Sequence, residues 1–316
     1  MNAAVPVHAM AAAPLDTVVV PIDSTTAALA DTATVNAVDT AAAAVPDTAT
    51  EPAWKTDMVV KLGGSQAKYQ NWSKGGVSSL ALTTGLDATA KHVSVNWEER
   101  HELHLAYGLI KQDTLNVQKA NDEVRLRGSV QHKSNATDFF RYFNPTVAIE
   151  IRTQFAPGYN YKSNPFKDGR ELPVKVSDRL SPLIMAQAIG LSYEPDKWFS
   201  QRLGVGAKQT VVADPEFRSL YGVDSARTYN MELGIESHTR FDRELFENVS
   251  LKSVLSLFGA FNKPDLPDMQ WENEVTMKVN TWLGVNFEVD ALYDRDFSRR
   301  VQIRELFSLG FAFTLL

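Results

Sequence analysis

The most informative features of this sequence are those that it lacks. Its 316 residues include no cysteine, so disulfides and thiolate metal ligands are excluded. No run of about twenty apolar residues occurs, which excludes a membrane-spanning helix. The net charge is -6 and the basic residues are not clustered, so nucleic acid is not an expected partner. These absences leave open a barrel that crosses a membrane with strands, because such a barrel uses only alternate residues to face lipid.

The N-terminal region lacks aromatic residues, and the first Lys or Arg of the chain is Lys55. A segment of Ala, Thr, Val, Asp and Pro buries too little apolar surface to offset the entropy of ordering. We therefore predict a disordered tail over residues 1–52 and a folded domain over residues 53–316. Export is expected, with the Ala-rich residues after Met10 as the end of a trimmed signal peptide.

Within this tail, Asp recurs every seven or eight residues, and each Asp is followed by Ser or Thr and then by Val, Thr or Ala. The pattern resembles the Asp-Ser/Thr-apolar acceptor for O-glycosylation in the Bacteroidota, and sugars would keep a flexible tether solvated. An unmodified linker is the alternative. The candidate acceptors are Thr17, Ser24, Thr32, Thr40 and Thr48.

The last sixteen residues alternate between an apolar and a polar or small face, except at Glu305, Leu306 and Leu316. One parity carries Val301, Ile303, Phe307, Leu309, Phe311, Phe313 and Leu315. The other carries Gln302, Arg304, Ser308, Gly310, Ala312 and Thr314. Such an apolar strand would promote aggregation at the edge of a soluble sheet, whereas it can close a barrel that faces lipid. The buried edge strand of a soluble sandwich shows the same alternation and is the alternative.

From Trp54 onward, alternating segments are separated by turn-forming clusters. The predicted fold is all-β: a closed, antiparallel, up-and-down transmembrane barrel of about twelve strands. The predicted strands are 57–67, 77–89, 93–110, 123–134, 145–156, 183–194, 199–211, 227–240, 248–261, 270–280, 282–295 and 300–316. Residues 156–182 and 212–227 are expected as long outside loops. Residues 135–145 and 239–248 are expected as periplasmic turns, although they are long for such turns.

Aromatic residues are expected in interfacial girdles, because they lie mainly near the ends of the predicted strands. They are Trp54, Trp72, Trp97, Tyr193, Trp198, Trp271, Trp282 and Tyr293.

The inward parity carries acidic and basic residues in equal number, which favours an interior cross-linked by ion pairs over a wide, ion-selective pore. Glu98 and Glu102 are expected opposite Arg125 and Arg127 on the neighbouring strand. The predicted lumen charge network comprises Glu98, Arg100, Glu102, Arg125, Arg127, Glu232, Glu236, Lys252, Glu288, Asp290 and Arg304.

A motif near the start of the folded domain resembles a known family. Its residues are Ser65-Gln66, Asn71-Trp72-Ser73 and Gly75-Gly76, followed by Trp97, Glu102 and Tyr107-Gly108. Together they resemble an uncharacterised Bacteroidota envelope family, domain of unknown function 3078. The family motif proper is Gln66, Asn71, Trp72, Ser73, Gly75 and Gly76. The resemblance implies an outer-membrane location and no activity, whereas the even number of strands predicts that both termini, and so the tail, lie in the periplasm.

The leading functional hypothesis is a barrel without chemistry of its own: a small porin or solute channel, or a structural subunit of an envelope complex. Its expected partners are outer-membrane lipid, other envelope proteins and a small solute in the lumen. The first alternative is a phospholipase-like barrel, for which His101 and Ser253 are the outward-facing candidates. The second is a soluble periplasmic sandwich on a glycosylated tether. No cofactor and no metal site are expected, because the histidines lack ligand spacing.

Overall fold

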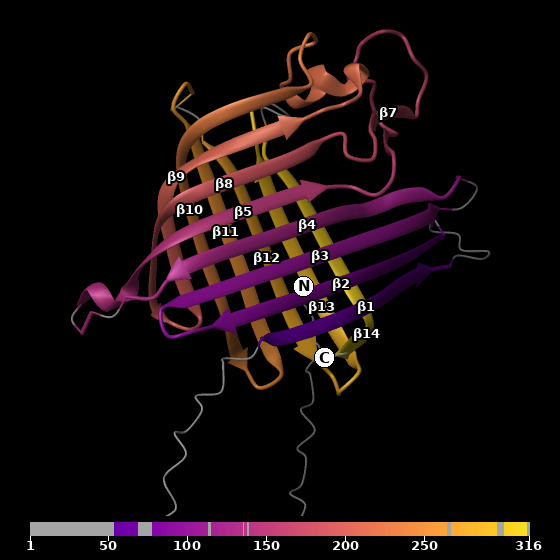
Figure 1. Ribbon diagram of the computed structural model, residues 1–316. Helices are drawn as coiled ribbons and strands as arrows, with labels where there is room; N and C mark the ends of the chain where they lie inside the picture. The colour runs from indigo at the N-terminus through magenta and orange to yellow at the C-terminus, as the bar shows by residue number, and fades with distance from the viewer. Residues whose placement is uncertain are drawn as a thin grey trace, which may run out of the picture. The chain divides into compact units, whose positions relative to one another are not determined.

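The computed structural model describes residues 54–68, 78–112, 115–134, 136–137, 139–263, 267–295 and 300–314. Twelve of the strands in these ranges form one closed antiparallel barrel, in the order β1-β14-β13-β12-β11-β10-β9-β8-β5-β4-β3-β2 (Figure 1). The barrel strands are β1 (Lys55–Ala67), β2 (Ser79–Val93), β3 (Trp97–Gln112), β4 (Gln118–His132), β5 (Phe143–Thr153), β8 (Leu183–Asp196), β9 (Phe199–Val211), β10 (Tyr229–Phe246), β11 (Val249–Ala260), β12 (Asp268–Lys278), β13 (Leu283–Tyr293) and β14 (Gln302–Thr314). A separate pair, β6 (Gly158–Asn160) and β7 (Val174–Ser177), forms a two-stranded sheet.

The first and last strands close the barrel, with Val59 opposite Thr314 and Gly64 opposite Leu309. The predicted closed barrel and its strand number are therefore confirmed. The open two-layer sandwich is wrong, because the C-terminal strand has a neighbour on each side. Among the described residues, no helix has the length and apolar character needed to cross a membrane.

The outer wall is apolar. Leu82, Ile189, Leu203 and Phe307 are 58%, 64%, 59% and 64% exposed, and many other outward Leu, Val and Ile side chains are similar. The interior is charged, and the buried apolar residues of the wall are mostly small, such as Ala148 and Ala188. An apolar exterior around a polar interior is the arrangement of a barrel that crosses a membrane, since water would disfavour such a surface.

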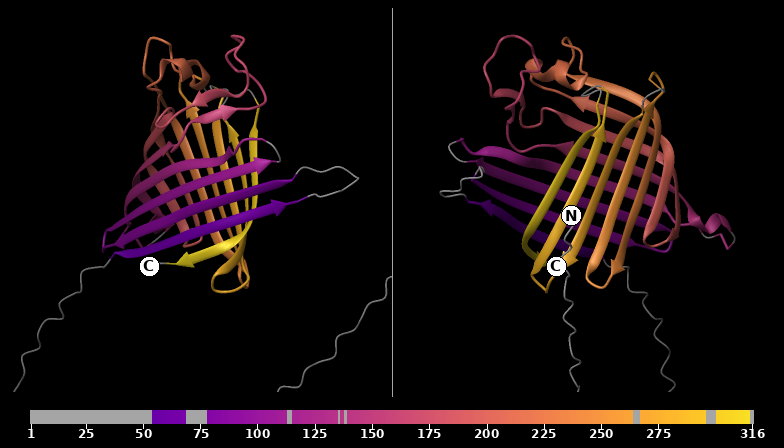
Figure 2. Two further views of the ribbon diagram at one scale, coloured as in Figure 1. Left: turned by 90° about the vertical axis from the view of Figure 1, so that its right-hand side faces the viewer. Right: turned by 180° about the vertical axis from the view of Figure 1, so that it is seen from behind.

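Figures 1 and 2 show β1–β5 on one side of the closed wall and β10–β13 on the other, and the wall bends between these sides at two corners. At one corner Gly190 of β8 lies opposite Gly204 of β9, and a Cβ on Gly190 would lie 2.2 Å from the Leu203 carbonyl oxygen. At the other, Gly310 of β14 lies opposite Gly63 of β1, and its Cβ would lie 2.1 Å from the Leu62 oxygen. Only glycine fits on the inner side of these bends.

The strand connections differ between the two ends of the barrel. Strands β2–β3, β8–β9, β10–β11 and β12–β13 are joined through 94–96, 197–198, 247–248 and 279–282, at what we call the short-turn end. At the opposite, long-loop end, residues 154–182 join β5 to β8 and residues 212–228 join β9 to β10. The expected alternation of long and short connections is therefore present.

The prediction of one turn is wrong, and another predicted turn is longer than the other turns at the same end. Residues 239–248 do not form a long turn, because β10 continues to Phe246 and pairs with β11 beyond the start of β9. Asp242, Arg243 and Glu244 are charged, as loop residues often are. They nevertheless lie in β10, whose hairpin with β11 extends beyond the first residue of β9. The β4–β5 connection, 133–142, does exceed the other short turns, and it contains the 3-10 helix η1 (Phe139–Tyr142).

We call residues 154–182 and 212–228 together the loop cap. It includes β6, β7 and the 3-10 helix η2 (Pro215–Tyr221), and it has its own apolar core of Val212, Phe217 and Val223. Asp214 caps η2 by accepting a hydrogen bond from the Glu216 amide at 3.0 Å. The Tyr221 hydroxyl donates to the Val176 carbonyl at 3.2 Å, which joins the two loops.

Aromatic residues mark both ends of the wall. At the short-turn end, Trp54 stacks on His92 and His101, Trp97 contacts His132, and Trp198 contacts Phe241. Trp282 and Tyr193 lie at the same end, whereas Trp271 and Tyr293 lie toward the long-loop end. The arrangement is that of interfacial girdles.

Several sequence predictions fall outside the described residues. They are the tail over 1–52 with all five candidate acceptors, and Asn71, Trp72, Ser73, Gly75 and Gly76 of the family motif. The remaining motif residue, Gln66, lies in β1 opposite Leu80.

Candidate functional site in the barrel lumen

Ion pairs connect opposite walls of the lumen. β4 and β12 are diametrically opposed, because five strands separate them in either direction around the barrel. Nevertheless Arg125 of β4 forms an ion pair with Glu272 of β12, and Arg127 reaches the same carboxylate at 3.2 Å. Glu102 of β3 likewise pairs with Arg240 of β10. We call these five residues the cross-lumen bridge.

The cross-lumen bridge is possible because the corners bring β3 and β4 to face β10 and β12. Each guanidinium in it contacts a carboxylate, which offsets the cost of removing both charges from bulk water. Arg127 also donates to Glu150 at 2.6 Å, and Glu102 lies 2.9 Å from Arg100. The bridge is therefore held by neighbours on its own walls as well as across the lumen.

Two cavities lie beside the cross-lumen bridge, and Glu102 and Arg127 line both of them. The larger has a volume of about 190 Å³ and extends toward β5, β8, β9 and β10. Its wall includes the small residues Ala148, Ala186 and Ala188. The smaller, of about 80 Å³, lies toward β2, β13 and β14 and is lined by Lys252, Glu288 and Arg304 among others.

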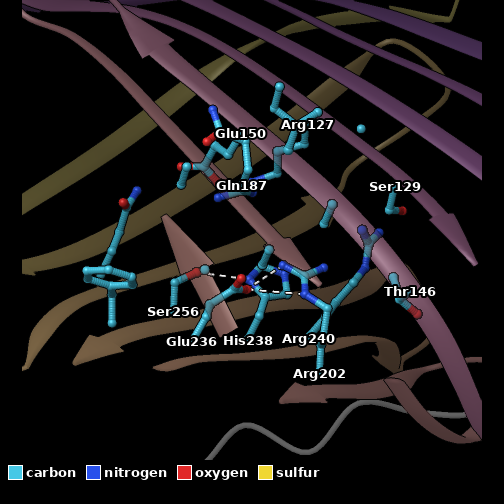
Figure 3. A pocket seen from close by; sticks show the side chains of 18 of the residues that line it. Arg127, Ser129, Thr146, Glu150, Gln187, Arg202, Glu236, His238, Arg240 and Ser256 are labelled. Atoms are coloured by element: carbon cyan, nitrogen blue, oxygen red, sulfur yellow. Dashed lines mark hydrogen bonds and ion pairs between the residues drawn. The ribbon is translucent and has the colours of Figure 1, made fainter. Parts of the chain in front are cut away.

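The larger cavity is lined by a partly buried histidine, His238 (Figure 3). His238 of β10 lies 2.9 Å, through Nδ1, from the Ser256 hydroxyl oxygen of β11. On the same strand face, Glu236 accepts from Arg202 at 2.5 Å. Because the Glu236 carboxylate is engaged by arginine, it is not the partner that would make a Ser-His pair into a catalytic triad.

The structure distributes the predicted charge network over several local groups. Glu98 contacts Lys91 at 2.6 Å and Lys133 at 3.0 Å at the short-turn end. Asp290 accepts from Arg304 at 2.9 Å, and Arg304 also reaches Asn121 at 2.5 Å.

Toward the long-loop end, Glu232 contacts Lys263 at 3.1 Å. Lys208 lies 3.7 Å from Glu232 and 2.7 Å from Asp294. Two members of the cross-lumen bridge, Arg240 and Glu272, are not in the predicted set, and neither is Glu123, which contacts Arg125 at 3.4 Å and Arg304 at 3.5 Å. Arg240 was missed because its segment was interpreted as the start of a turn, whereas Glu123 shares the inward parity of Arg125 and could have been found.

The expected pairing of Glu98 and Glu102 with Arg125 and Arg127 is only partly right. Glu102 does lie opposite Arg127 in the register, but Glu98 lies opposite Gln131 and Arg125 opposite His104. Since Arg127 turns to Glu150 and Glu272, Glu102 pairs instead with Arg100 and Arg240. The ion pairs follow proximity across the lumen more than position on adjacent strands.

The two candidate hydrolase residues are not brought together. His101 stacks on Trp54 on the outside of β3, whereas Ser253 on β11 accepts from the Trp271 indole at 3.0 Å. Five strands lie between β3 and β11 on one side and five on the other, counting around the closed order. In the part of the chain that the structure describes, no group of three His, Asp or Glu has the geometry of a metal site.

The barrel resembles solved outer-membrane barrels. The translocator domain of autotransporter NalP from Neisseria meningitidis is 8% identical, with a TM-score of 0.37, over 84% of this chain and 90% of that one. The COG4313 outer membrane channel from Pseudomonas putida F1 is 10% identical, with a TM-score of 0.35, over 86% and 99%. OmpF of Salmonella typhi, in complex with daunomycin, is 7% identical, with a TM-score of 0.26, over 84% and 98%. No curated protein matches the chain.

A family match covers the part of the barrel that carries the recognised motif. Residues 65–159, from the end of β1 into β6, match the family described as Protein of unknown function (DUF3078), which confirms the resemblance to domain of unknown function 3078.

Proposed function

We propose that this protein is an outer-membrane solute channel whose lumen is constricted by the cross-lumen bridge. The apolar wall and the aromatic residues at both ends support insertion into a bilayer. The polar lumen supports passage or binding of a small polar solute. The observation that carries the proposal is the ion pairing of β3 and β4 with β10 and β12, with a cavity on each side of it.

Constriction by paired charges has a physical consequence for conduction. An ion or solute that passes the cross-lumen bridge must separate Glu102 from Arg240, or Glu272 from the two arginines. Separation exposes partly buried charges, which is costly unless water or the solute replaces the lost partner. The intact channel should therefore conduct weakly and favour small solutes that carry both charges.

Single-channel recording in planar bilayers tests this proposal. Substituting Glu102→Ala and Arg240→Ala together removes one arm of the bridge without changing the net charge, and it should raise the conductance severalfold. The matched control is Arg170→Ala with Glu216→Ala, an ion pair of the loop cap that does not line either cavity. A bridge variant that conducts no better than wild type and control would contradict the constriction.

A structural subunit of an envelope complex is the second candidate. The loop cap favours it, because a loop with its own buried core presents a fixed surface to a partner. Purification of the barrel with stoichiometric envelope proteins, from membranes solubilised in mild detergent, would support this role. Such a complex should be lost when residues 154–182 are replaced by a short Gly-Ser linker.

We also propose that the barrel performs no chemistry. In the described ranges of the chain, the Ser-His contact between Ser256 and His238 lies inside the lumen rather than facing lipid. Release of fatty acid from phospholipid vesicles by the purified protein, abolished by Ser256→Ala, would contradict this proposal.

The tail is proposed to extend into the periplasm of a Bacteroidota cell and to carry sugars on its Asp-Ser/Thr sites. Intact-mass measurement of the native protein would test for the sugars.

A further inference from the structure

An aromatic cluster extends sideways from the wall at the short-turn end. It consists of Phe139, Phe140, Arg141 and Tyr142 of η1 together with Phe143 of β5 and Tyr193 of β8, and we call it the aromatic foot. Figures 1 and 2 show η1 projecting laterally, beyond the outline of the barrel, rather than along its axis. Most connections at this end are tight turns, so the foot is an added element rather than a requirement of the fold.

The rings of the aromatic foot hold one another in place. The Phe139 and Phe143 centroids are 5.2 Å apart, and those of Phe143 and Tyr193 are 5.1 Å apart. Phe139 and Phe140 nevertheless remain 60% and 65% exposed. Two adjacent exposed phenylalanines are unfavourable in water, so this surface should contact something apolar.

The aromatic foot is continuous with the lipid-facing wall. Phe143 starts β5 on the same parity as Val147 and Ile149, which are 54% and 41% exposed. Tyr193 lies three residues before the end of β8, on the same parity as Ile189 and Leu191. The exposed rings of η1 therefore extend the apolar wall outward at the level of the aromatic girdle, where the bilayer changes from acyl chains to headgroups.

The foot also carries a cation suited to a headgroup. The Arg141 guanidinium carbon lies 4.6 Å from the centre of the Tyr142 ring. An arginine beside aromatic rings is typical of segments at a membrane interface, since the rings enter the acyl boundary while the guanidinium binds phosphate. Charge and shape thus fit a phospholipid better than a neutral apolar partner.

We propose that the aromatic foot binds phospholipid in the leaflet at the short-turn end, with Phe139 and Phe140 at the acyl boundary and Arg141 on a lipid phosphate. This interaction fixes the depth and tilt of the barrel, and it goes beyond the channel function. The proposal requires only that the barrel is embedded in a bilayer, and a label at position 203 in the same experiment tests this separately.

The absence of cysteine allows single spin labels to be placed without background. Phe140→Cys reports the foot, Leu203→Cys reports the outer wall, and Ser225→Cys reports the loop cap. Each labelled protein is reconstituted into vesicles of phosphatidylethanolamine and phosphatidylglycerol. The collision rates of the label with oxygen and with a water-soluble nickel complex then measure its depth.

The label at position 140 should favour oxygen over nickel, at a depth between those of the labels at 203 and 225. A label at 140 as accessible to nickel as the label at 225 would overturn the proposal, and so would dipolar broadening from a second copy. If the label at 203 itself were exposed to nickel, the membrane barrel would be wrong whatever the foot showed. Adding Arg141→Gln should increase the mobility of the label at 140, and unchanged mobility would overturn the role of the phosphate.

Discussion

The loop cap buries its apolar side chains in a core, whereas the barrel wall exposes its apolar side chains on the outer surface. In the cap, Phe217 and Val212 are fully buried, whereas on the wall Leu203 and Phe307 are mostly exposed. The cap folds as a soluble protein does, around an apolar core. The wall instead relies on lipid outside and on ion pairs inside. The comparison teaches that the medium around each region, and not its composition, decides which face is apolar.

The largest expected effect comes from truncating the core of the loop cap. Phe217→Ala removes a buried ring that contacts Val212 and Val223, and it should destabilise the cap by about 3–5 kcal/mol. Proteolysis should then cut residues 154–182 and 212–228, while the barrel keeps its heat-modifiable gel mobility. The control Phe307→Ala on the outer wall should cost far less. Equal losses in the two variants would break the comparison.

Placing a charge on the wall tests its contact with lipid. Leu203→Arg exposes a guanidinium to acyl chains and should cost about 2–4 kcal/mol of folding stability in a bilayer. The counterpart Ser200→Arg, on the lumen side of the same strand, should cost less because other charges and water surround it. Urea titration of folding into vesicles measures both variants. A soluble barrel would show the reverse order.

The corners of the wall should tolerate no side chain. Gly190→Ala places a Cβ against the Leu203 carbonyl, so the wall must shift at a cost of about 1–3 kcal/mol. Gly259→Ala is the matched control, because a Cβ there meets nothing within 4 Å. Urea titration of folding into vesicles should give Gly190→Ala a much lower folding stability than Gly259→Ala. If Gly190→Ala kept the stability of the control, the corner would have room for a Cβ and the close backbone approach would be wrong.

The smallest expected effect is a pH dependence confined to the loop cap. The hydrogen bond from Lys175, at 2.5 Å, lowers the pKa of Asp178 and raises the pKa of Lys175. The stabilisation is complete between the unfolded pKa values of about 4 and 10.4. It is lost as pH falls through the folded pKa of Asp178, or rises through that of Lys175.

Both side chains are about a third exposed, so solvent screens the pair and the effect is small. Protease cleavage of the cap should increase modestly at acid pH, and Asp178→Asn should abolish this dependence. An acid response that persists in Asp178→Asn would assign it to another group.

Much of the barrel could be predicted because alternation is a local property. The parity of Phe307 and Leu309 against Arg304 and Ser308 identified the lipid face without any knowledge of neighbours. The extension of β10 to Phe246 was missed because its charged residues do not show the alternation of apolar and polar residues that predicts a strand. The corner glycines gave no signal, since an isolated Gly in a strand does not reveal which backbone approaches it.

The sequence by itself determined the number of strands, the apolar exterior and the charged interior, since each depends only on residues that are neighbours along one strand. Only the tertiary structure decided that Glu272 meets Arg125 and Arg127, and that Glu102 meets Arg240. Those contacts depend on how sharply the wall bends at its glycines. Charges on opposite walls are distant in sequence, and the curvature of the closed sheet sets the distance between them.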